Sequence, residues 1–250
     1  MATSLEGVLP IDKPAGITSF KLVALLRRLT DVAKIGHAGT LDPFATGVML
    51  LLVGRSYTRL SDRFMASDKE YLATLHLGIE TDSHDIEGKQ VSTSDLIPSL
   101  AAIEETLALF AGWQEQIPPM YSAKKLQGKK LYELARQGIA VERPPSSVFM
   151  EPELIAYHYP FLEVRLRCSK GTYVRGLARD LGRRLGCGAH LQKLCRTRSG
   201  SISLESCLDG GSLVRGEASL DSLASHWMTI DALSLGEDAD LPLSTTLSAY

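Results

Sequence analysis

The residues best suited to chemistry lie in the stretch 36–47, whose sequence is GHAGTLDPFATG. It holds one carboxylate, Asp42, and one imidazole, His37, among three glycines, one proline and mostly small or apolar neighbours. Glycine allows close backbone approach or a positive φ, and Pro43 fixes the chain directly after the acid. This composition predicts a rigid loop that presents the carboxylate. The alternative is structural, because an Asp in such a turn can simply accept hydrogen bonds from backbone N–H groups.

Two other segments could supply a partner and a hydroxyl for this carboxylate. Residues 69–78 alternate between polar and apolar, which predicts a strand with Tyr71 on its apolar face. A tyrosine there can equally be part of the core. The segment KGTYVRG, residues 170–176, precedes an expected helix that ends near residue 185 and places Arg175 at its start. Thr172 is the expected cap, and a helix start preceded by glycine favours anions.

The surrounding pattern is that of a mixed α and β protein whose elements must bring these segments together. A buried strand is expected over 48–53, directly after the Asp42 loop, and a helix capped by Thr18 or Ser19 runs to about residue 29. The polar stretch 81–88 is interpreted as a solvated turn, since its spacing fits no calcium loop. The remaining expected elements are a short strand over 7–13, helices over 55–65, 95–110 and 131–138, and a strand pair over 147–159 and 161–169.

The 250 residues have a formal net charge of −2, but the charge is distributed unevenly. Residues 121–200 hold 16 Lys and Arg against 6 Asp and Glu, whereas both flanking parts are acidic. A central segment this basic indicates a polyanionic partner. The alternative is a set of solvated faces whose charges are neutralised by acidic neighbours in the fold.

Composition excludes several other classes of protein. No apolar run reaches the roughly 18 residues of a membrane span, and the first residues lack the basic and apolar parts of a signal peptide. The four cysteines form no C-x-x-C pair, so neither a disulfide framework nor a zinc site is expected. We therefore expect a cytoplasmic protein without a metal.

The stretch 116–130 breaks the regular pattern with two prolines, a Met-Tyr pair and four lysines. An extended basic loop with apolar tips suits RNA, because lysines meet phosphates and aromatic rings meet bases. We expect Lys124, Lys125 and Lys129 to contact the RNA backbone, together with Lys13, which lies in the turn after the first strand.

These segments together resemble the tRNA pseudouridine-55 synthase family of the TruB type. The 36–47 loop, residues 69–71 and residues 170–175 are similar to the three catalytic motifs of that family, in the same order. The opening LPIDKPAG, residues 9–16, and the later RTRSG, residues 196–200, resemble two further motifs. The resemblance extends from about residue 7 to about residue 232.

The resemblance implies a fold and a reaction. The fold is α/β, of the α+β kind, with a central, mostly antiparallel bent sheet, flanking helices and an RNA-binding cleft. The reaction is the isomerisation of the uridine at position 55 in the T-arm of tRNA to pseudouridine, after the base has been flipped out. No cofactor is implied, and tRNA is the expected partner of a monomer without an obligate protein partner.

The resemblance also assigns roles to residues. Asp42, Tyr71 and Arg175 match the catalytic positions, and Arg175 would hold the Asp42 carboxylate ionised and oriented. The positions that match substrate-binding residues are His37, Tyr71, Tyr173 and Leu194. A carboxylate beside an anomeric carbon is also what glycosidic cleavage requires on chemical grounds.

The resemblance further implies a catalytic domain over 1–225 with an RNA-gripping insertion over 118–148. Residues 226–250 are expected to be a short tail in place of the C-terminal PUA domain that family members commonly carry. Two alternatives to the tRNA enzyme remain: a synthase of the same fold that acts on another RNA, and an RNA chaperone without chemistry. A chaperone has no use for a buried carboxylate, which would repel the RNA backbone.

Overall fold

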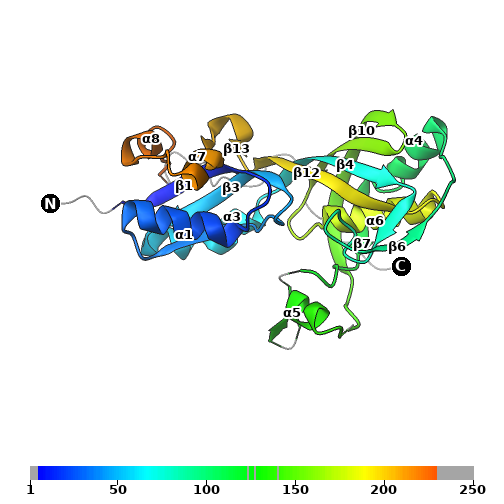
Figure 1. Ribbon diagram of the computed structural model, residues 1–250, viewed down its shortest axis with the longest axis horizontal. Helices are drawn as coiled ribbons and strands as arrows, with labels where there is room; N and C mark the ends of the chain where they lie inside the picture. The colour runs from blue at the N-terminus through cyan, green and yellow to red at the C-terminus, as the bar shows by residue number, and fades with distance from the viewer. Residues whose placement is uncertain (1–4, 123, 127, 140, 230–250) are drawn as a thin grey trace, which may run out of the picture.

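The computed structural model describes residues 5–122, 124–126, 128–139 and 141–229. Figure 1 shows an elongated molecule in which one long strand, β12, runs between two groups of elements. The first group contains β1 (Gly7–Lys13), α1 (Ser19–Thr30), β2 (Ile35–Ala38), β3 (Thr46–Val53), α2 (Arg55–Thr58) and α3 (Ser61–Ala66). The C-terminal elements β13 (Ile202–Ser203), β14 (Leu208–Asp209), α7 (Gly210–Arg215) and α8 (Leu220–Ala224) pack with that first group.

The second group contains most of the remaining elements. Its elements are β4 (Lys69–Leu77), β5 (Ile79–Thr81), β6 (Gln90–Thr93), α4 (Leu100–Ala108), β7 (Gly112–Gln116), β10 (Ser146–His158), β11 (Phe161–Cys168) and α6 (Val174–Arg184). Strand β12 (Ala189–Ser199) completes both groups, because it pairs with β3 on one side and β4 on the other.

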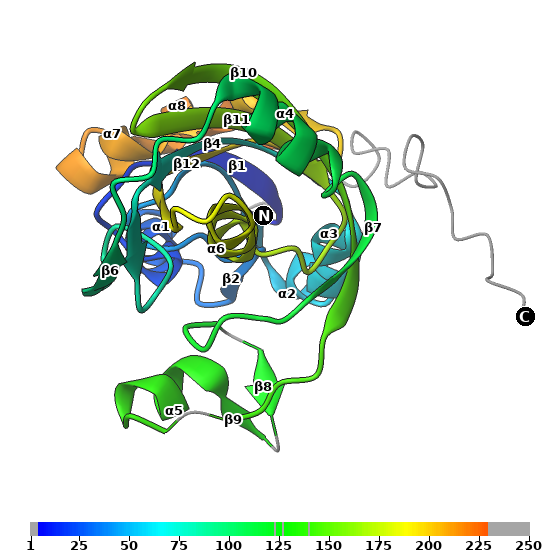
Figure 2. The ribbon, with the colours of Figure 1, turned by 90° about the vertical axis from the view of Figure 1, so that its right-hand side faces the viewer.

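Ten strands of the described chain form a single sheet. Its main path runs β14-β1-β3-β12-β4-β11-β10-β7, with β2 paired to β3 and β13 to β12. The β1–β14 and β3–β12 pairs are parallel and the others in this sheet are antiparallel. The expected mixed, mostly antiparallel sheet with flanking helices is therefore confirmed, and Figure 2 shows that it bends over α6.

Residue patterns explain why the central strands lie where they do. In β3 every residue after Thr46 is buried, so the strand is covered on both faces. In β4 the buried residues alternate, with Tyr71, Ala73, Leu75 and Leu77 on the face toward the core, as predicted. Helix α6 lies beneath the bent sheet, where it buries Leu177, Ala178 and Leu181. The sheet and α6 thus form the core that positions the site.

The insertion between β7 and β10 stands apart from the rest. It contains the short strands β8 (Lys125–Leu126) and β9 (Lys129–Lys130) and the helix α5 (Leu131–Arg136). Figures 1 and 2 both show these elements projecting below the sheet.

Several local predictions are confirmed and others are wrong. Thr18 caps α1 by accepting from the Lys21 N–H, as predicted. Thr172 does not cap α6, because its hydroxyl donates to the Ser169 carbonyl and Tyr173 occupies the N-cap position.

Two helix predictions also need correction. The helix expected over 95–110 begins only at Leu100, since Ser99 caps it by accepting from the Ala102 N–H. The helix expected over 55–65 is interrupted between α2 and α3.

No helix in the described ranges is long and apolar enough to cross a membrane. Most of the tail expected over 226–250 lies outside the described residues, which end at 229.

Candidate active site

The Asp42 loop connects β2 to β3 and is fixed by contacts from α1 and β1. The Ser19 hydroxyl lies 3.0 Å from both the N–H and the carbonyl of Leu41, accepting from the first and donating to the second. The Ala45 N–H donates to the Asp42 carbonyl at 3.1 Å. These hydrogen bonds hold the loop against α1, and His37, which was expected within the loop, lies in β2 before it.

Lys13 supports the same loop from below. Its side chain is fully buried, and its ammonium donates to the carbonyls of Pro14, Pro43 and Ala45 at 3.0, 3.1 and 2.7 Å. Burial lowers the pKa of Lys13 to about 8. An ammonium in this position cannot reach a phosphate, so the prediction that Lys13 contacts the RNA backbone is wrong. Lys13 instead supports the Asp42 loop.

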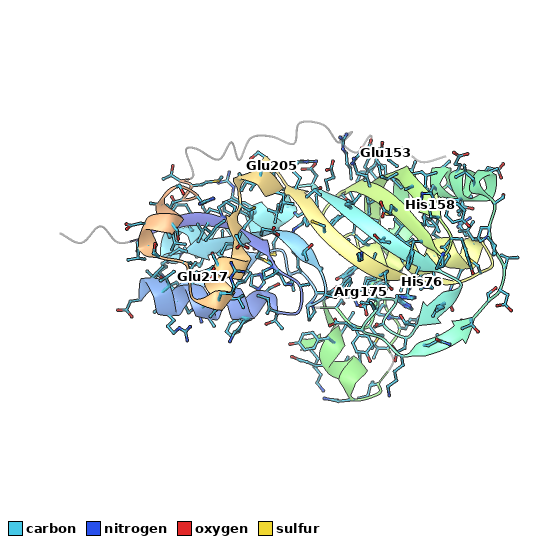
Figure 3. The ribbon with its side chains drawn as sticks, turned by 45° about the horizontal axis from the view of Figure 1, so that its top comes forward. His76, Glu153, His158, Arg175, Glu205 and Glu217 are labelled. Carbon is cyan, nitrogen blue, oxygen red and sulfur yellow. The ribbon has the colours of Figure 1, made fainter. Side chains whose placement is uncertain are left out.

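Arg175 is the partner of Asp42. Its Nε lies 3.0 Å from Asp42 Oδ2, and its Nη2 lies 3.3 Å from Oδ1, so the guanidinium grips both carboxylate oxygens. The remaining N–H groups face Asp85 Oδ2 at 3.3 Å and the carbonyls of Ser83 at 3.4 Å and Tyr121 at 2.7 Å. The Arg175 side chain is 7% exposed and lies in the middle part of the molecule (Figure 3).

Asp85 is a site residue that the sequence reasoning missed. The turn that contains it was expected to be solvated, but the Asp85 side chain is only 5% exposed. Its Oδ1 accepts from the Ser83 hydroxyl at 2.5 Å and from the Glu87 N–H at 3.1 Å, which leaves Oδ2 facing Arg175. Nothing in the polar composition of residues 81–88 distinguishes this buried carboxylate from its neighbours, so only its partner reveals it.

The electrostatics of Asp42 follow from these neighbours. Burial raises the pKa of the Asp42 carboxyl above its ordinary value, while Arg175 opposes that increase, Asp85 adds to it, and Lys13 opposes it. The expectation that Arg175 favours the ionised form is correct in sign. Burial nevertheless outweighs the arginine, so the net shift is upward.

Arg196, a residue of the later motif, fills the space behind the loop. It is 1% exposed, and it donates from Nε to the Val48 carbonyl at 2.6 Å and from Nη2 to the Gly39 carbonyl at 2.9 Å. Burial raises the pKa of the Tyr71 hydroxyl, and the Arg196 guanidinium opposes that increase. Gly47 has φ +101°, and a Cβ there would lie 2.2 Å from the Arg196 carbonyl oxygen. This glycine is required both by its backbone and by the close approach of β12.

A cavity of about 800 Å³ unites the candidate residues. The sequence-predicted residues that line it are His37, Asp42, Tyr71, Tyr173, Arg175 and Leu194. The Nδ1 atom of His37 is buried without a hydrogen-bond partner, and burial lowers the pKa of this imidazole. The structure thus gathers these six residues around one cavity, whereas the expected lysine contacts lie elsewhere.

The other lysines expected to contact RNA belong to the insertion. Lys124 and Lys129 are exposed, and the Lys124 ammonium donates to the Ser146 hydroxyl at 2.6 Å. Lys125 belongs to β8, and its side chain lies outside what the structure describes. Among the described residues, no group of three or more His, Cys, Asp or Glu side chains could hold a metal ion.

The fold resembles known structures. The chain superposes on a crystal structure of a Cbf5-Nop10-Gar1 complex with a TM-score of 0.68 and 25% sequence identity, covering 90% of this chain and 60% of that one. The chain thus spans less than two thirds of that protein. This likeness supports the overall fold.

Family models place the chain more narrowly. Residues 27–174 match the N-terminal domain of the TruB family of pseudouridylate synthases, and residues 175–216 match the tRNA pseudouridylate synthase B C-terminal domain. The fold and the family match are those of a pseudouridine synthase, an isomerase. The chain belongs to the TruB family.

Relatives agree with this placement. The chain is 62% identical over 209 residues to the tRNA pseudouridine synthase B of Protochlamydia amoebophila (strain UWE25), covering 84% of this chain and 80% of that protein. It is 54% identical to the tRNA pseudouridine synthase B of Chlamydia muridarum (strain MoPn / Nigg), covering 84% and 87%.

Proposed function

We propose that the protein converts one uridine of tRNA, at position 55 in the T-arm, to pseudouridine. The N1–C1′ bond breaks, the uracil turns, and a C5–C1′ bond forms while the C5 proton is lost and N1 gains a proton. The reaction is redox-neutral and needs no co-reactant. Its tRNA substrate is supported by the names of the relatives, and the position by the resemblance of the motifs.

The observation that carries this proposal is the Asp42–Arg175 pair at the cavity. The Asp42 side chain is one third exposed, whereas Arg175 is 7% exposed, so the carboxylate faces the cavity and the guanidinium lies behind it. An ionised carboxylate can attack C1′ or stabilise positive charge that develops there. Both routes require Asp42 without its proton, and Arg175 stabilises that form.

The remaining candidate residues form the site for the flipped base. A cavity of about 800 Å³ can hold a nucleotide. We assign Tyr71, Tyr173 and Leu194 to its walls and His37 to the support of the flipped arrangement. Because burial raises the pKa of Tyr71, its phenol stays protonated at neutral pH. A protonated phenol is a weak proton acceptor, which favours contact with the base over removal of the C5 proton.

The insertion is assigned to the grip on RNA. We place the insertion at 118–148 of a catalytic domain over 1–225, and its exposed Lys124 and Lys129 are accessible to phosphates. We propose that the protein acts on tRNA as a monomer in the cytoplasm, where tRNA is found.

The test uses an unmodified tRNA transcript labelled with tritium at C5 of uridine. The protein is expected to release tritium and to leave one pseudouridine, mapped to position 55. A transcript with cytidine at position 55 should release none, and tritium release from that transcript would show that the assigned position is wrong.

The role of Asp42 is tested with Asp42→Asn, which should release almost no tritium. The matched control is Asp82→Asn, because Asp82 lines the same cavity but accepts from the Lys89 N–H at 2.9 Å. If Asp42→Asn works as fast as the unaltered protein, the proposed catalysis is wrong.

A further inference from the structure

Gln116 connects the root of the insertion to the start of the catalytic helix. It is the last residue of β7, and it is 3% exposed. Its Oε1 accepts from the Tyr173 N–H at 2.7 Å, and its Nε2 donates to the Tyr173 carbonyl at 2.9 Å. One side-chain amide therefore bonds both backbone groups of Tyr173, much as a neighbouring strand would, and the Tyr173 carbonyl also accepts from the Leu177 N–H at 3.2 Å.

The need for this contact follows from the geometry of the helix start. Tyr173 is the N-cap of α6, with an extended backbone (φ −107°, ψ 111°) and no hydrogen bond from its own side chain to the helix. A buried backbone N–H without a partner is costly. Gln116 supplies that partner, and it fits because residue 176 is glycine. A Cβ at Gly176 would lie 2.8 Å from the Gln116 Nε2.

Arg175 follows Tyr173 by two residues, and a residue of the insertion contacts Arg175 directly. The Tyr121 carbonyl accepts from Arg175 Nη2 at 2.7 Å, and this is the same nitrogen that faces Asp42 Oδ1. Gln116 lies just before the insertion, at the end of β7, and Tyr121 lies near the beginning of the insertion. The base of the RNA-gripping segment thus holds both the backbone before Arg175 and its guanidinium.

We propose that Gln116 is a positioning residue that sets the Arg175 guanidinium on Asp42 and so couples the insertion to the catalytic pair. The inference rests on the proposed roles of Asp42 and Arg175. A displacement of a catalytic group by about 1 Å can cost on the order of 100-fold in rate. Loss of the clamp is therefore expected to slow the chemical step while the RNA-facing surface stays as it is.

The first test compares Gln116→Ala with Gln114→Ala in single-turnover tritium release and in tRNA binding. Gln114 is a matched control, because it lies on the same strand and donates to the carbonyls of Leu109 and Ala111 instead of α6. We expect Gln116→Ala to lower the rate on the order of tenfold or more, with the Kd for tRNA changed by less than about twofold. Gln114→Ala should change neither. Equal losses of rate and affinity in Gln116→Ala would overturn the proposal.

The second test uses Gln116→Glu and pH, and it decides the question even if the alanine variant does not fold. An ionised Glu can accept from the Tyr173 N–H but offers no donor to the Tyr173 carbonyl, whereas a protonated Glu restores both bonds. The rate of Gln116→Glu divided by that of the unaltered protein should therefore rise as the pH falls from about 8 to about 5.5. Dividing the rates removes the pH dependence that the two proteins share.

The outcomes separate the two proposals. A ratio that does not change with pH would overturn the role of Gln116. If the unaltered protein forms no pseudouridine in tRNA, the proposed function fails instead, whatever the variants do.

Discussion

Replacement of Arg175 by methionine tests the electrostatics of the site, because it removes the guanidinium and keeps an unbranched buried side chain. The carboxylate of Asp42 then loses a cation whose Nε lies 3.0 Å away. The pKa of Asp42, already raised by burial, should rise further. A reaction that needs ionised Asp42 loses rate as the pH falls through that pKa. The acidic limb of the pH–rate profile should therefore move to higher pH.

The size of the shift can be worked out from the geometry. Two unit charges about 4 Å apart interact by about 4 kcal/mol at an effective dielectric constant of about 20. That energy corresponds to about 3 pKa units. The Asp42 side chain is one third exposed, so solvent screens part of the interaction. We expect the limb to move upward by about 1–3 pH units.

The assay is single-turnover tritium release from C5-labelled tRNA between about pH 5 and 9, with tRNA affinity measured at each pH. Affinity should change little, because the Arg175 side chain is 7% exposed and therefore inaccessible to phosphates. Arg179→Met is the control. Arg179 lies one turn further along α6 and also grips a carboxylate with two nitrogens, that of Asp180 at 2.7 and 2.9 Å.

Two results would refute the reasoning. An acidic limb that stays in place would mean that Arg175 does not govern the ionisation of Asp42. Equal losses of rate and affinity would make Arg175 a contact to RNA instead.

Three further predictions follow from the site. Asp85→Asn removes a carboxylate that raises the pKa of Asp42. The acidic limb of any remaining activity should therefore move to lower pH, opposite in direction to Arg175→Met. A limb that moves to higher pH would contradict this. Burial lowers the folded-state pKa of Lys13 to about 8, so the unfolded chain binds more protons than the folded chain between about pH 8 and 10. In urea unfolding, the difference in free energy of unfolding between the unaltered protein and Lys13→Met should therefore increase as the pH rises, by up to about 1.4 kcal/mol per pH unit. Gly47→Ala should lower the free energy of unfolding by several times the roughly 1–2 kcal/mol expected for Gly16→Ala, because Gly16 has a similar positive φ but open space around it. Equal losses of stability in thermal unfolding would refute the steric argument.

Local pattern sufficed for the parts of the fold that local chemistry determines. The alternation in 69–77 gave β4 its buried face, and Thr18 capped α1 because its hydroxyl reaches the Lys21 N–H three residues away. Such contacts depend on neighbours in sequence, which a reader of the chain can see. The candidate residues were found for another reason, since their motifs resemble those of a family.

The missed features depend on partners that are remote in sequence. Asp85 belongs to a turn of ordinary polar composition, and its carboxylate pairs with Arg175, which is remote in sequence. Lys13 was expected on the surface because lysine usually is. Its ammonium is instead satisfied by carbonyls of the Asp42 loop, 30 and 32 residues away. No periodicity encodes either contact.

The position of β12 has a consequence for synthesis of the protein. This strand lies between β3 and β4 in the sheet, yet it is synthesised after both of them and after all the elements of the second group. At about 5–20 residues per second, the ribosome needs roughly 7–30 s to proceed from β3 to β12. During that interval the edge of β4 that later pairs with β12 has no partner, and such an edge invites pairing with other chains. Strand β3 is better protected, because it already pairs with β2, and β12 later pairs with it only at Thr46 and Gly47. The nascent protein should therefore depend on chaperones most strongly just before residues 189–199 emerge.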